Sequence, residues 1–326
     1  MREDLLQVLA EPTTGASLSL AVTQGKGDSI ETGTLTSTQT GKVFPIVGGI
    51  PRFVDSENYA SSFGRQWNAF RAVQIDSQNG YAQSQYRFET ETGWSDDEIK
   101  GKWMLDGGCG AGRFAEIAAK KGARIVGLDI SSAVDACKKT VADYPLADVV
   151  QGSLLDPPFK KASFDFAYSI GVMQHTPDPK TAVRRFLECV KPLGRFTLTI
   201  YRRGPFTKLH SKYLVRPLTK RLPQEALLKG IEMAMPVVFP VTEKLFSIPV
   251  ASKLFRFMIP VANYVERTDM TREDRYQEAV LDTFDMLSPA YDLPMTAQEV
   301  ESVLRDLKAH SWSIPKDSAL LVRGEA

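Results

Sequence analysis

The sequence contains few cysteines and histidines and no excess of charge of either sign. Only three cysteines occur in 326 residues, too few and too far apart for a disulfide framework or a zinc site. Lys plus Arg number 40 and Asp plus Glu 39, a formal net charge of +1 that argues against a dedicated nucleic-acid-binding protein. The first residues hold no apolar signal-peptide core, and no run of about 18 apolar residues occurs. These absences predict a reduced, cytoplasmic protein without a membrane-spanning helix.

Short apolar segments alternate with helical ones from residue 102 onward. Strands are expected at 103–106, 124–129, 148–151, 164–170 and 195–201, and helices at 112–121, 131–142 and 178–190. A helix at 296–309, which opens with a capping box, and strands at 311–314 and 318–323 close the chain. Strands that alternate with helices of about 10–15 residues predict an α/β fold, with a Rossmann-like parallel sheet covered on both faces.

Two segments do not follow this alternation. Residues 1–54 contain short strand-like pieces broken by Gly and Pro, which predicts a small β extension. Residues 202–295 are far too long for a plain loop and should contain helices. We therefore expect three parts: the extension 1–54, a main domain of 55–201 with 296–326, and a helical insertion or lid of 202–295.

The most informative segment is the glycine-rich loop after the first strand of the main domain, Leu105–Gly112. Glycines there allow a tight turn and let a ligand approach the backbone. Asp129 ends the next strand, where a carboxylate suits the two hydroxyls of a ribose. Asp106 lies at the mouth of the loop, where it would repel a pyrophosphate but attract a cation. The loop therefore favours S-adenosyl-L-methionine, which has an ammonium and a sulfonium but no phosphate, over a dinucleotide or a plain turn.

These motifs resemble those of class I S-adenosylmethionine-dependent methyltransferases of the type 11 kind, over residues 102–201 and, weakly, at the end of the chain. The resemblance continues through 151–153, 164–169, 175–179 and 190–194. It implies cofactor contacts from Asp106, Gly107, Gly108, Cys109, Gly110, Gly112, Asp129, Ile130, Ser153, Leu154 and Ser169. Ser153 departs from the Asp that the family often has for the adenine amino group, and Leu193 replaces a usual Gly.

Residues 1–54 resemble the small zinc-ribbon domain that precedes some methyltransferases and that is similar to the activator subunit of tRNA methyltransferases. That family has cysteine pairs at the positions of Glu11 and Thr14, and of Ser37 and Thr40. Zinc needs thiolate or imidazole ligands, so a single Glu among hydroxyls should hold no metal. The resemblance implies a degenerate ribbon, and a generic β extension is the alternative.

Several residues are candidates for acceptor chemistry. His175 follows the fourth strand of the main domain at the edge where ligands bind, and could act as a general base or only shape the loop. Tyr276, Asp285 and Tyr291 precede the last helix and could contact the acceptor, or lie on a solvated helix face. Phe63, Gln66 and Trp67 have helical spacing and could close over the cofactor or belong to the core.

The predicted function is methyl transfer from S-adenosyl-L-methionine to a hydroxyl of a small-molecule, sugar or lipid-like acceptor. Carbon methylation of a quinone-like ring is an alternative, because residues 175–179 resemble those of quinone-biosynthesis methyltransferases. A non-catalytic cofactor-binding partner subunit is another, although the intact set of Asp106, Gly108, Gly110 and Asp129 disfavours it. The near-zero net charge argues against RNA as the acceptor.

The insertion is both basic and apolar. Residues 202–256 contain five Arg and six Lys against three Glu, and several apolar stretches accompany them. Seven prolines between Pro205 and Pro260 should cut the segment into short helices and forbid a membrane span. Two interpretations remain: a cap that packs over the active site, or a lid that also makes peripheral contact with an anionic membrane through residues 202–262.

Overall fold

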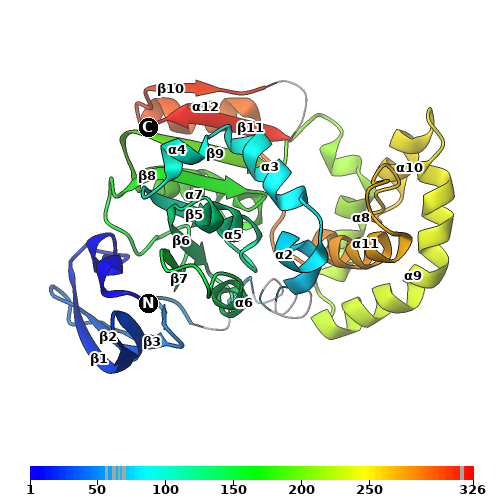
Figure 1. The fold of residues 1–326 in the computed structure, drawn as a ribbon. Coiled ribbons are helices and arrows are strands. Elements are labelled where there is room, and N and C mark those ends of the chain that lie inside the picture. The colour runs from blue at the N-terminus through cyan, green and yellow to red at the C-terminus, as the bar shows by residue number, and fades with distance from the viewer. Residues whose placement is uncertain (56–57, 61–63, 65–66, 68–70, 316–318) are drawn as a thin grey trace.

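The computed structural model describes residues 1–55, 58–60, 64, 67, 71–315 and 319–326, and its centre is a seven-stranded sheet (Figure 1). The strands are β5 (Trp103–Gly107), β6 (Arg124–Asp129), β7 (Ala147–Gln151), β8 (Phe164–Ile170), β9 (Val190–Ile200), β10 (Ser311–Ser313) and β11 (Leu320–Glu325). They lie in the order β10-β11-β9-β8-β5-β6-β7. Strands β5 to β9 are parallel, whereas β11 is antiparallel to both β9 and β10. The predicted α/β, Rossmann-like sheet is confirmed.

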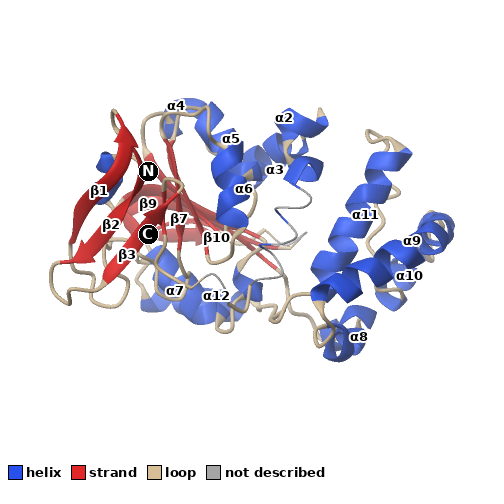
Figure 2. Ribbon diagram, turned by 90° about the horizontal axis from the view of Figure 1, so that it is seen from below, coloured by secondary structure: helices blue, strands red, loops and turns tan. Residues whose placement is uncertain are grey.

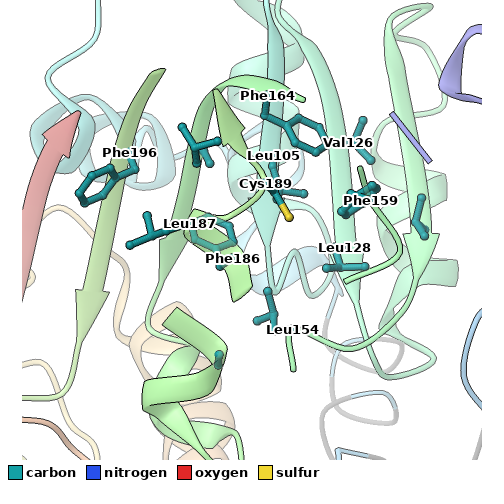
Figure 3. Close-up of a cluster of buried hydrophobic side chains, with 14 of the residues drawn as sticks. Leu105, Val126, Leu128, Leu154, Phe159, Phe164, Phe186, Leu187, Cys189 and Phe196 are labelled. Carbon is teal, nitrogen blue, oxygen red and sulfur yellow. The ribbon is translucent and has the colours of Figure 1, made fainter. Parts of the chain in front are cut away.

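Helices cover both faces of this sheet (Figure 2). One face holds α3 (Gln83–Thr92), α4 (Asp96–Ile99), α5 (Arg113–Lys120) and α6 (Ala133–Thr140), and the other holds α7 (Pro179–Leu187) and α12 (Ala297–Asp306). Buried apolar side chains fill the space between the sheet and α7, among them Leu105, Leu128, Phe164 and Phe186 (Figure 3). Their removal from water is the main force that holds these layers together.

The N-terminal residues form a separate antiparallel sheet that docks beside β7 (Figure 1). Its strands are β1 (Leu18–Lys26), β2 (Ser29–Ser37), β3 (Val43–Val47) and β4 (Ile50–Pro51), preceded by the short helix η1 (Glu3–Gln7). Arg2 donates to the buried Asp148 of β7, with Nη2 2.9 Å and Nε 3.0 Å from Oδ2. The Phe53 amide donates to the Gln151 carbonyl at 2.8 Å, so the docking continues the hydrogen bonding of β7.

Residues 202–295, which we name the lid, contain a group of helices at the end of the central sheet that lies away from the N-terminal sheet (Figure 1). The lid helices are η4 (Thr207–Leu209), α8 (Ser211–Thr219), α9 (Gln224–Phe246), α10 (Ser252–Met258) and α11 (Arg272–Leu287). The two ends of the lid meet at the sheet, because the Met295 amide donates to the Tyr201 carbonyl at 2.9 Å and Arg203 donates to the Met295 carbonyl at 2.8 Å. The lid therefore leaves and rejoins the main domain at one place.

The expectation that prolines divide the lid into short helices is wrong for α9. This helix has 23 residues with Pro236 and Pro240 inside, and it bends along its length (Figure 1). A proline in a helix removes one backbone hydrogen bond and commonly bends the helix instead of ending it. Leu227, Ile231 and Met235, spaced four apart, pack with α11 in a buried cluster that offsets this loss. Within the described residues, no helix combines the length and apolar character that crossing a bilayer requires.

A second difference concerns the start of β9. The strand begins at Val190, five residues earlier than expected, and the predicted helix ends at Leu187 instead of reaching residue 190. Leu193, which stands at a usual glycine position of the resembling family, has a φ of +61° and an exposed side chain. This left-handed conformation strains a residue with a Cβ, so the position keeps the backbone shape that glycine adopts freely.

Candidate functional site

A cavity of about 1000 Å³ lies between the carboxyl ends of the sheet strands and the lid. Its walls include the loops after β5, β6 and β8, the segment after β9, and residues of α11. Strand β5 is flanked by β6 on one side and by β8 on the other, so the chain leaves β5 where the strand order reverses. Ligands of open α/β sheets bind outside the carboxyl ends at such a point.

The glycine loop after β5 forms the floor of this cavity. Gly108 and Gly110 line it, with φ values of +87° and +51° that glycine adopts without strain. A Cβ on Gly108 would lie 2.3 Å from Val172 Cγ1, so no other residue fits there. Gly112, with φ +90°, precedes the first residue of α5, and the amide groups of the first turn of α5 point toward the loop.

Asp106 is the least compensated charge near the loop. Its side chain is 2% exposed, and Oδ2 has no hydrogen-bond partner within the described part of the chain. Burial raises the pKa of Asp106 to about 8, an effect that the charge of Asp129 reinforces and the Tyr168 hydroxyl opposes. A buried carboxylate in this condition favours a bound cation, because a cation supplies the missing partner and stabilises the ionised form.

Asp129 lies at the end of β6 and also lines the cavity. Its Oδ2 accepts from the Gly110 amide at 3.0 Å, and Oδ1 accepts from the amide and hydroxyl of Ser131 at 2.8 and 2.7 Å. Burial raises the pKa of Asp129, and these hydrogen bonds oppose the rise. The carboxylate is thus held in a fixed orientation at the cavity wall, where it can still accept from ligand hydroxyls.

The remaining predicted cofactor residues fall into two groups. Cys109, Ile130 and Leu154 line the cavity. Gly107 and Ser169 support the loop from outside the lining: a Cβ on Gly107 would lie 2.6 Å from Phe186, and the Ser169 hydroxyl donates to the Gly107 carbonyl at 2.7 Å. Ser153 is also outside the lining, and its Oγ accepts from the Leu155 amide at 3.1 Å within its own turn. The arrangement fits a ligand with a cation beside Asp106 and hydroxyls beside Asp129.

His175 lines the same cavity from the short helix after β8. Its Nδ1 lies 3.0 Å from the Tyr291 carbonyl oxygen. Because a carbonyl oxygen can only accept a hydrogen bond, Nδ1 carries the proton and Nε2 carries a lone pair. Burial lowers the pKa of His175 to about 4; Asp292 and the Tyr291 carbonyl oppose this, and Lys212 and Arg216 add to it. His175 is therefore neutral at physiological pH and is a weak base.

The predicted acceptor residues occupy different places. Asp285 lines the cavity from α11. Tyr291 packs edge-on against Tyr59, with ring centroids 5.5 Å apart, and its carbonyl orients His175. Tyr276 does not line the cavity; its ring packs against Phe239 at 5.4 Å in the cluster between α9 and α11. Trp67 lines the cavity, whereas Phe63 and Gln66 lie outside the described residues.

A polar chain that the sequence did not predict connects the lid to the glycine loop. Arg113, the first residue of α5, donates through Nη1 to Gln74 Oε1 at 2.6 Å. Gln74 Nε2 donates to Asp282 of α11 at 3.2 Å, and Asp282 also accepts from the Tyr264 hydroxyl at 2.6 Å. These four residues come from separate parts of the chain, and no local motif signals their contact.

Comparison with known proteins gives one family match. Residues 105–198 match the methyltransferase domain family, a stretch that holds the glycine loop, Asp129 and His175. Similar curated proteins include two described as ubiquinone biosynthesis O-methyltransferase. That of Neisseria meningitidis serogroup C is 30% identical over 132 residues, which cover 39% of this chain and 56% of the relative. That of Coxiella burnetii is 35% identical over 107 residues, which cover 32% of this chain and 46% of the relative. The chain thus spans about half the length of the curated relatives it matches.

Among solved structures, similar ones include proteins described as S-adenosylmethionine-dependent methyltransferases. That of Methanococcus maripaludis is 15% identical, with a TM-score of 0.44 and coverage of 83% of this chain and 94% of that one. That of Mesorhizobium loti is 26% identical, with a TM-score of 0.30 and coverage of 32% and 49%.

Proposed function

We propose that the protein is an S-adenosyl-L-methionine-dependent methyltransferase that methylates a hydroxyl of a small-molecule, sugar or lipid-like acceptor. The observation that supports this most is Asp106, a buried carboxylate at the end of β5, one oxygen of which has no hydrogen-bond partner among the described residues. It lies within the stretch that matches the methyltransferase domain family. A carboxylate in that position complements an ammonium and disfavours a diphosphate.

The residues of the loop have distinct roles in this proposal. Asp106 binds the methionine ammonium and Asp129 binds the ribose hydroxyls, while Gly108 and Gly110 allow the ligand to lie against the backbone. Ile130, Leu154 and Cys109 form the apolar wall for the nucleoside. When bound, S-adenosyl-L-methionine supplies a methyl group on a sulfonium, which an acceptor atom displaces in line. The chain contributes orientation, exclusion of water by the lid, and acceptance of the hydroxyl proton.

Oxygen is the favoured acceptor atom because the curated relatives are described as O-methyltransferases. His175, Asp285 and Tyr291 lie where an acceptor would enter, at or beside the cavity wall. Carbon methylation of a quinone-like ring is the second candidate, supported by the resemblance of residues 175–179. The cavity with Asp106 and Asp129 both in place argues against a non-catalytic partner subunit.

Calorimetry with S-adenosylhomocysteine, the demethylated product, tests the cofactor assignment. The protein should bind it, and Asp106→Asn and Asp129→Asn should each weaken binding at least tenfold, because each removes a charge-assisted hydrogen bond of about 1.5–3 kcal/mol. Asp97→Asn, a change on the exposed side of α4, should leave the affinity unchanged. Preferential binding of NAD, or full affinity in both site variants, would overturn the assignment.

For residues 1–54 we propose a degenerate zinc ribbon in which hydrogen bonds replace the metal. The four positions that would be ligands come together around Glu11, which is 3% exposed. Glu11 Oε2 accepts from the hydroxyls of Ser37 at 2.6 Å and Thr14 at 2.7 Å, and Oε1 accepts from Thr40 at 3.0 Å. One carboxylate thus joins the same two turns that a tetrahedral zinc would join.

For the lid we propose peripheral contact with an anionic membrane. Most of the large apolar side chains exposed in the described residues lie within residues 202–262 of the lid; they are Phe206, Leu209, Leu214, Leu218, Leu222, Met233, Val237, Val241, Ile248, Val250, Leu254 and Met258. Val250 and Met233 are 94% and 82% exposed. Such side chains insert at the boundary between lipid headgroups and acyl chains.

The charge of the lid complements such a surface. Five Arg and six Lys against three Glu between residues 202 and 256 give a net charge of +8. Each basic residue near an anionic leaflet contributes about 1 kcal/mol of attraction. Phe206, which is exposed, and Phe257 also line the cavity, so the lid surface is continuous with the cavity wall. An amphiphilic acceptor could reach the cavity from the membrane by this route.

A further inference from the structure

The lid side of the cavity has a row of carboxylates on one helix. Glu278, Asp282 and Asp285 of α11 all line the cavity, at spacings of four and three residues that place them on one helix face. We call this set the α11 face. It stands in the same cavity as the glycine loop, so a molecule that fills the space beside the cofactor would contact it.

Glu278 is the residue of this face with an unsatisfied oxygen. Its side chain is 4% exposed, and within the described residues Oε2 has no hydrogen-bond partner. Among the side chains that the structure describes, Arg267 pairs with it, but Nη1 lies 4.0 Å from Oε2, beyond hydrogen-bond range. Arg267 is itself held by two bonds of 2.9 Å to Asp269. A buried carboxylate oxygen left in this state is costly unless a ligand donates to it.

The neighbouring Asp282 fixes the position of the α11 face. Its two oxygens accept from the neutral groups of Gln74 and Tyr264, and Gln74 continues to Arg113 at the start of α5. The row of carboxylates is therefore held at a defined place relative to the cofactor loop. Such preorganisation is what orientation of an acceptor against a cofactor requires.

Transfer to a hydroxyl also requires a proton acceptor, and His175 is poorly suited to this role. Its Nδ1 donates to the Tyr291 carbonyl, which leaves the lone pair on Nε2, but burial lowers the pKa of the ring to about 4, so Nε2 holds a proton only weakly at neutral pH. A general base works best when its pKa lies near the working pH. The cavity must therefore supply another group if the proposed hydroxyl methylation is correct.

We propose that the α11 face binds the acceptor hydroxyl and that Glu278 receives its hydrogen bond and then its proton. The inference rests on the proposed function. In the step, the acceptor oxygen forms a bond to the methyl carbon, the bond from that carbon to sulfur breaks, and its electron pair stays on sulfur. The hydroxyl proton passes to Glu278 Oε2, so charge and atoms balance without a further reactant.

The titration of Glu278 agrees with this role. Burial raises its pKa to about 7, and Asp282 on the same helix adds to the rise. Arg267 from the preceding segment and Arg113 from α5 oppose it, and Asp269 reinforces it. Glu278 thus titrates near neutral pH, where it can accept a proton that His175 would not hold.

Binding of small hydroxyl probes to protein saturated with S-adenosylhomocysteine tests the proposal. The probes are catechol for phenolic hydroxyls, methyl glucoside for alcohol hydroxyls, and veratrole, the dimethyl ether of catechol, as the probe without a donor. The variants are Glu278→Gln and, as a matched control on the exposed side of the same helix, Glu273→Gln. We expect one hydroxyl probe to bind the wild-type protein, and to bind Glu278→Gln about tenfold or more weakly.

The pH dependence separates proton acceptance from a structural role. Affinity for the hydroxyl probe should rise between about pH 6 and pH 8 in the wild-type protein and in Glu273→Gln, and should be flat in Glu278→Gln. Equal affinities in all three proteins, a persistent rise in Glu278→Gln, equal binding of veratrole, or no binding of either hydroxyl probe would each overturn the inference. Loss of S-adenosylhomocysteine binding in Glu278→Gln would assign the residue to the cofactor instead. Failure of the wild-type protein to bind S-adenosylhomocysteine would refute the proposed function itself.

Discussion

At the scale of single residues, the ionisation of Asp106 is unfavourable in the free protein and can be favoured by a bound ligand. Its pKa of about 8 means that the carboxyl is mostly protonated at neutral pH in the free protein. A bound ammonium favours the ionised form, because an opposite charge lowers the pKa of a carboxyl. Ligand binding and loss of the Asp106 proton are therefore thermodynamically linked.

We accordingly predict that S-adenosylhomocysteine binding releases a proton at pH 7. Affinity should rise as the pH increases toward about 8, and then level off, because Asp106 is already ionised above its pKa. Calorimetry in two buffers of different ionisation enthalpy measures the released proton. In Asp106→Asn the release should vanish, and a release that persists there would contradict the assignment.

The same residue should affect the stability of the free protein. A carboxyl whose pKa is raised by folding weakens the folded state as the pH climbs from its ordinary value of about 4 through the folded value of about 8. Asp106→Asn removes this penalty. The variant should therefore melt at a higher temperature than the wild-type protein at pH 8 and lose this advantage near pH 4. Differential scanning calorimetry of both proteins over this range is the measurement.

The site residues that could be predicted from the sequence are those that belong to short local motifs. Asp106, Gly108 and Gly110 belong to the end of β5 and the glycine loop, Asp129 ends the next strand, and the structure places all four at one cavity. Glu278 was not predicted, because its role depends on how α11 packs across the cavity. Its burial, and the absence of a hydrogen-bond partner for its Oε2 among the described residues, are tertiary properties that no spacing in the sequence expresses.

At the scale of elements, the Glu11 cluster makes the N-terminal sheet sensitive to acid. The hydroxyls of Ser37, Thr14 and Thr40 hold the pKa of Glu11 below its usual range, against the opposing effect of burial. A depressed carboxyl pKa adds stability above its unfolded value, and this stability is lost as the pH falls through the folded value. The ribbon-like turns should therefore be the acid-labile part of this sheet.

Glu11→Gln tests this without changing the size of the side chain. The melting temperature should fall at pH 7, and the gap to the wild-type protein should close as the pH drops below about 4. Asp28→Asn, an exposed change at the turn between β1 and β2, is the control. Elemental analysis should find no stoichiometric zinc, and one zinc per chain would contradict a hydrogen-bonded replacement of the metal.

The lid helices make a separate prediction about membranes. The wild-type protein should co-sediment with phosphatidylglycerol vesicles at low salt, and less with phosphatidylcholine vesicles or at high salt, because screening weakens the attraction of basic residues. Met233→Glu combined with Val250→Glu should abolish binding, since both side chains are exposed on the lid. Val22→Glu, an exposed change on β1, should have no effect. No binding to anionic vesicles at low salt would leave the lid as a cap only.

The lid also shows why element boundaries were harder to predict than the sheet. The strands at the centre of the sheet, β5 to β8, follow from short apolar runs, and these runs are visible in the sequence. The length of α9 instead depends on its packing with α11, which lets Pro236 and Pro240 stay within one helix. Local rules treat those prolines as helix ends, but tertiary contacts override them.

At the scale of the whole molecule, the N-terminal sheet and the main domain share one core. Leu5, Leu35 and Phe44 belong to the same buried cluster as Leu128 and Val150 of the central sheet. The ion pair between Arg2 and Asp148 lies beside this cluster, and Asp148 is 1% exposed. The two parts should therefore unfold together and not in sequence.

Asp148→Asn should lower the free energy of unfolding by about 2 kcal/mol, because it replaces charge-assisted hydrogen bonds by neutral ones. Urea denaturation followed by tryptophan fluorescence and by far-ultraviolet circular dichroism measures this. The two signals should give one midpoint in the wild-type protein and in the exposed control Asp143→Asn. Two separated midpoints in the wild-type protein would show that residues 1–54 fold independently.

The meeting of the two lid ends at the sheet has a consequence for how such proteins can diversify. A backbone hydrogen bond joins Tyr201 and Met295, so the segment between them begins and ends at the same place on the main domain. Because the entropy cost of closing a loop grows only slowly with its length, this segment can be lengthened or exchanged at little cost in stability. Such a change leaves the positions of β9 and α12 unaltered. Natural variation can therefore remodel the part of the cavity that this segment forms, while the part formed by the glycine loop stays constant.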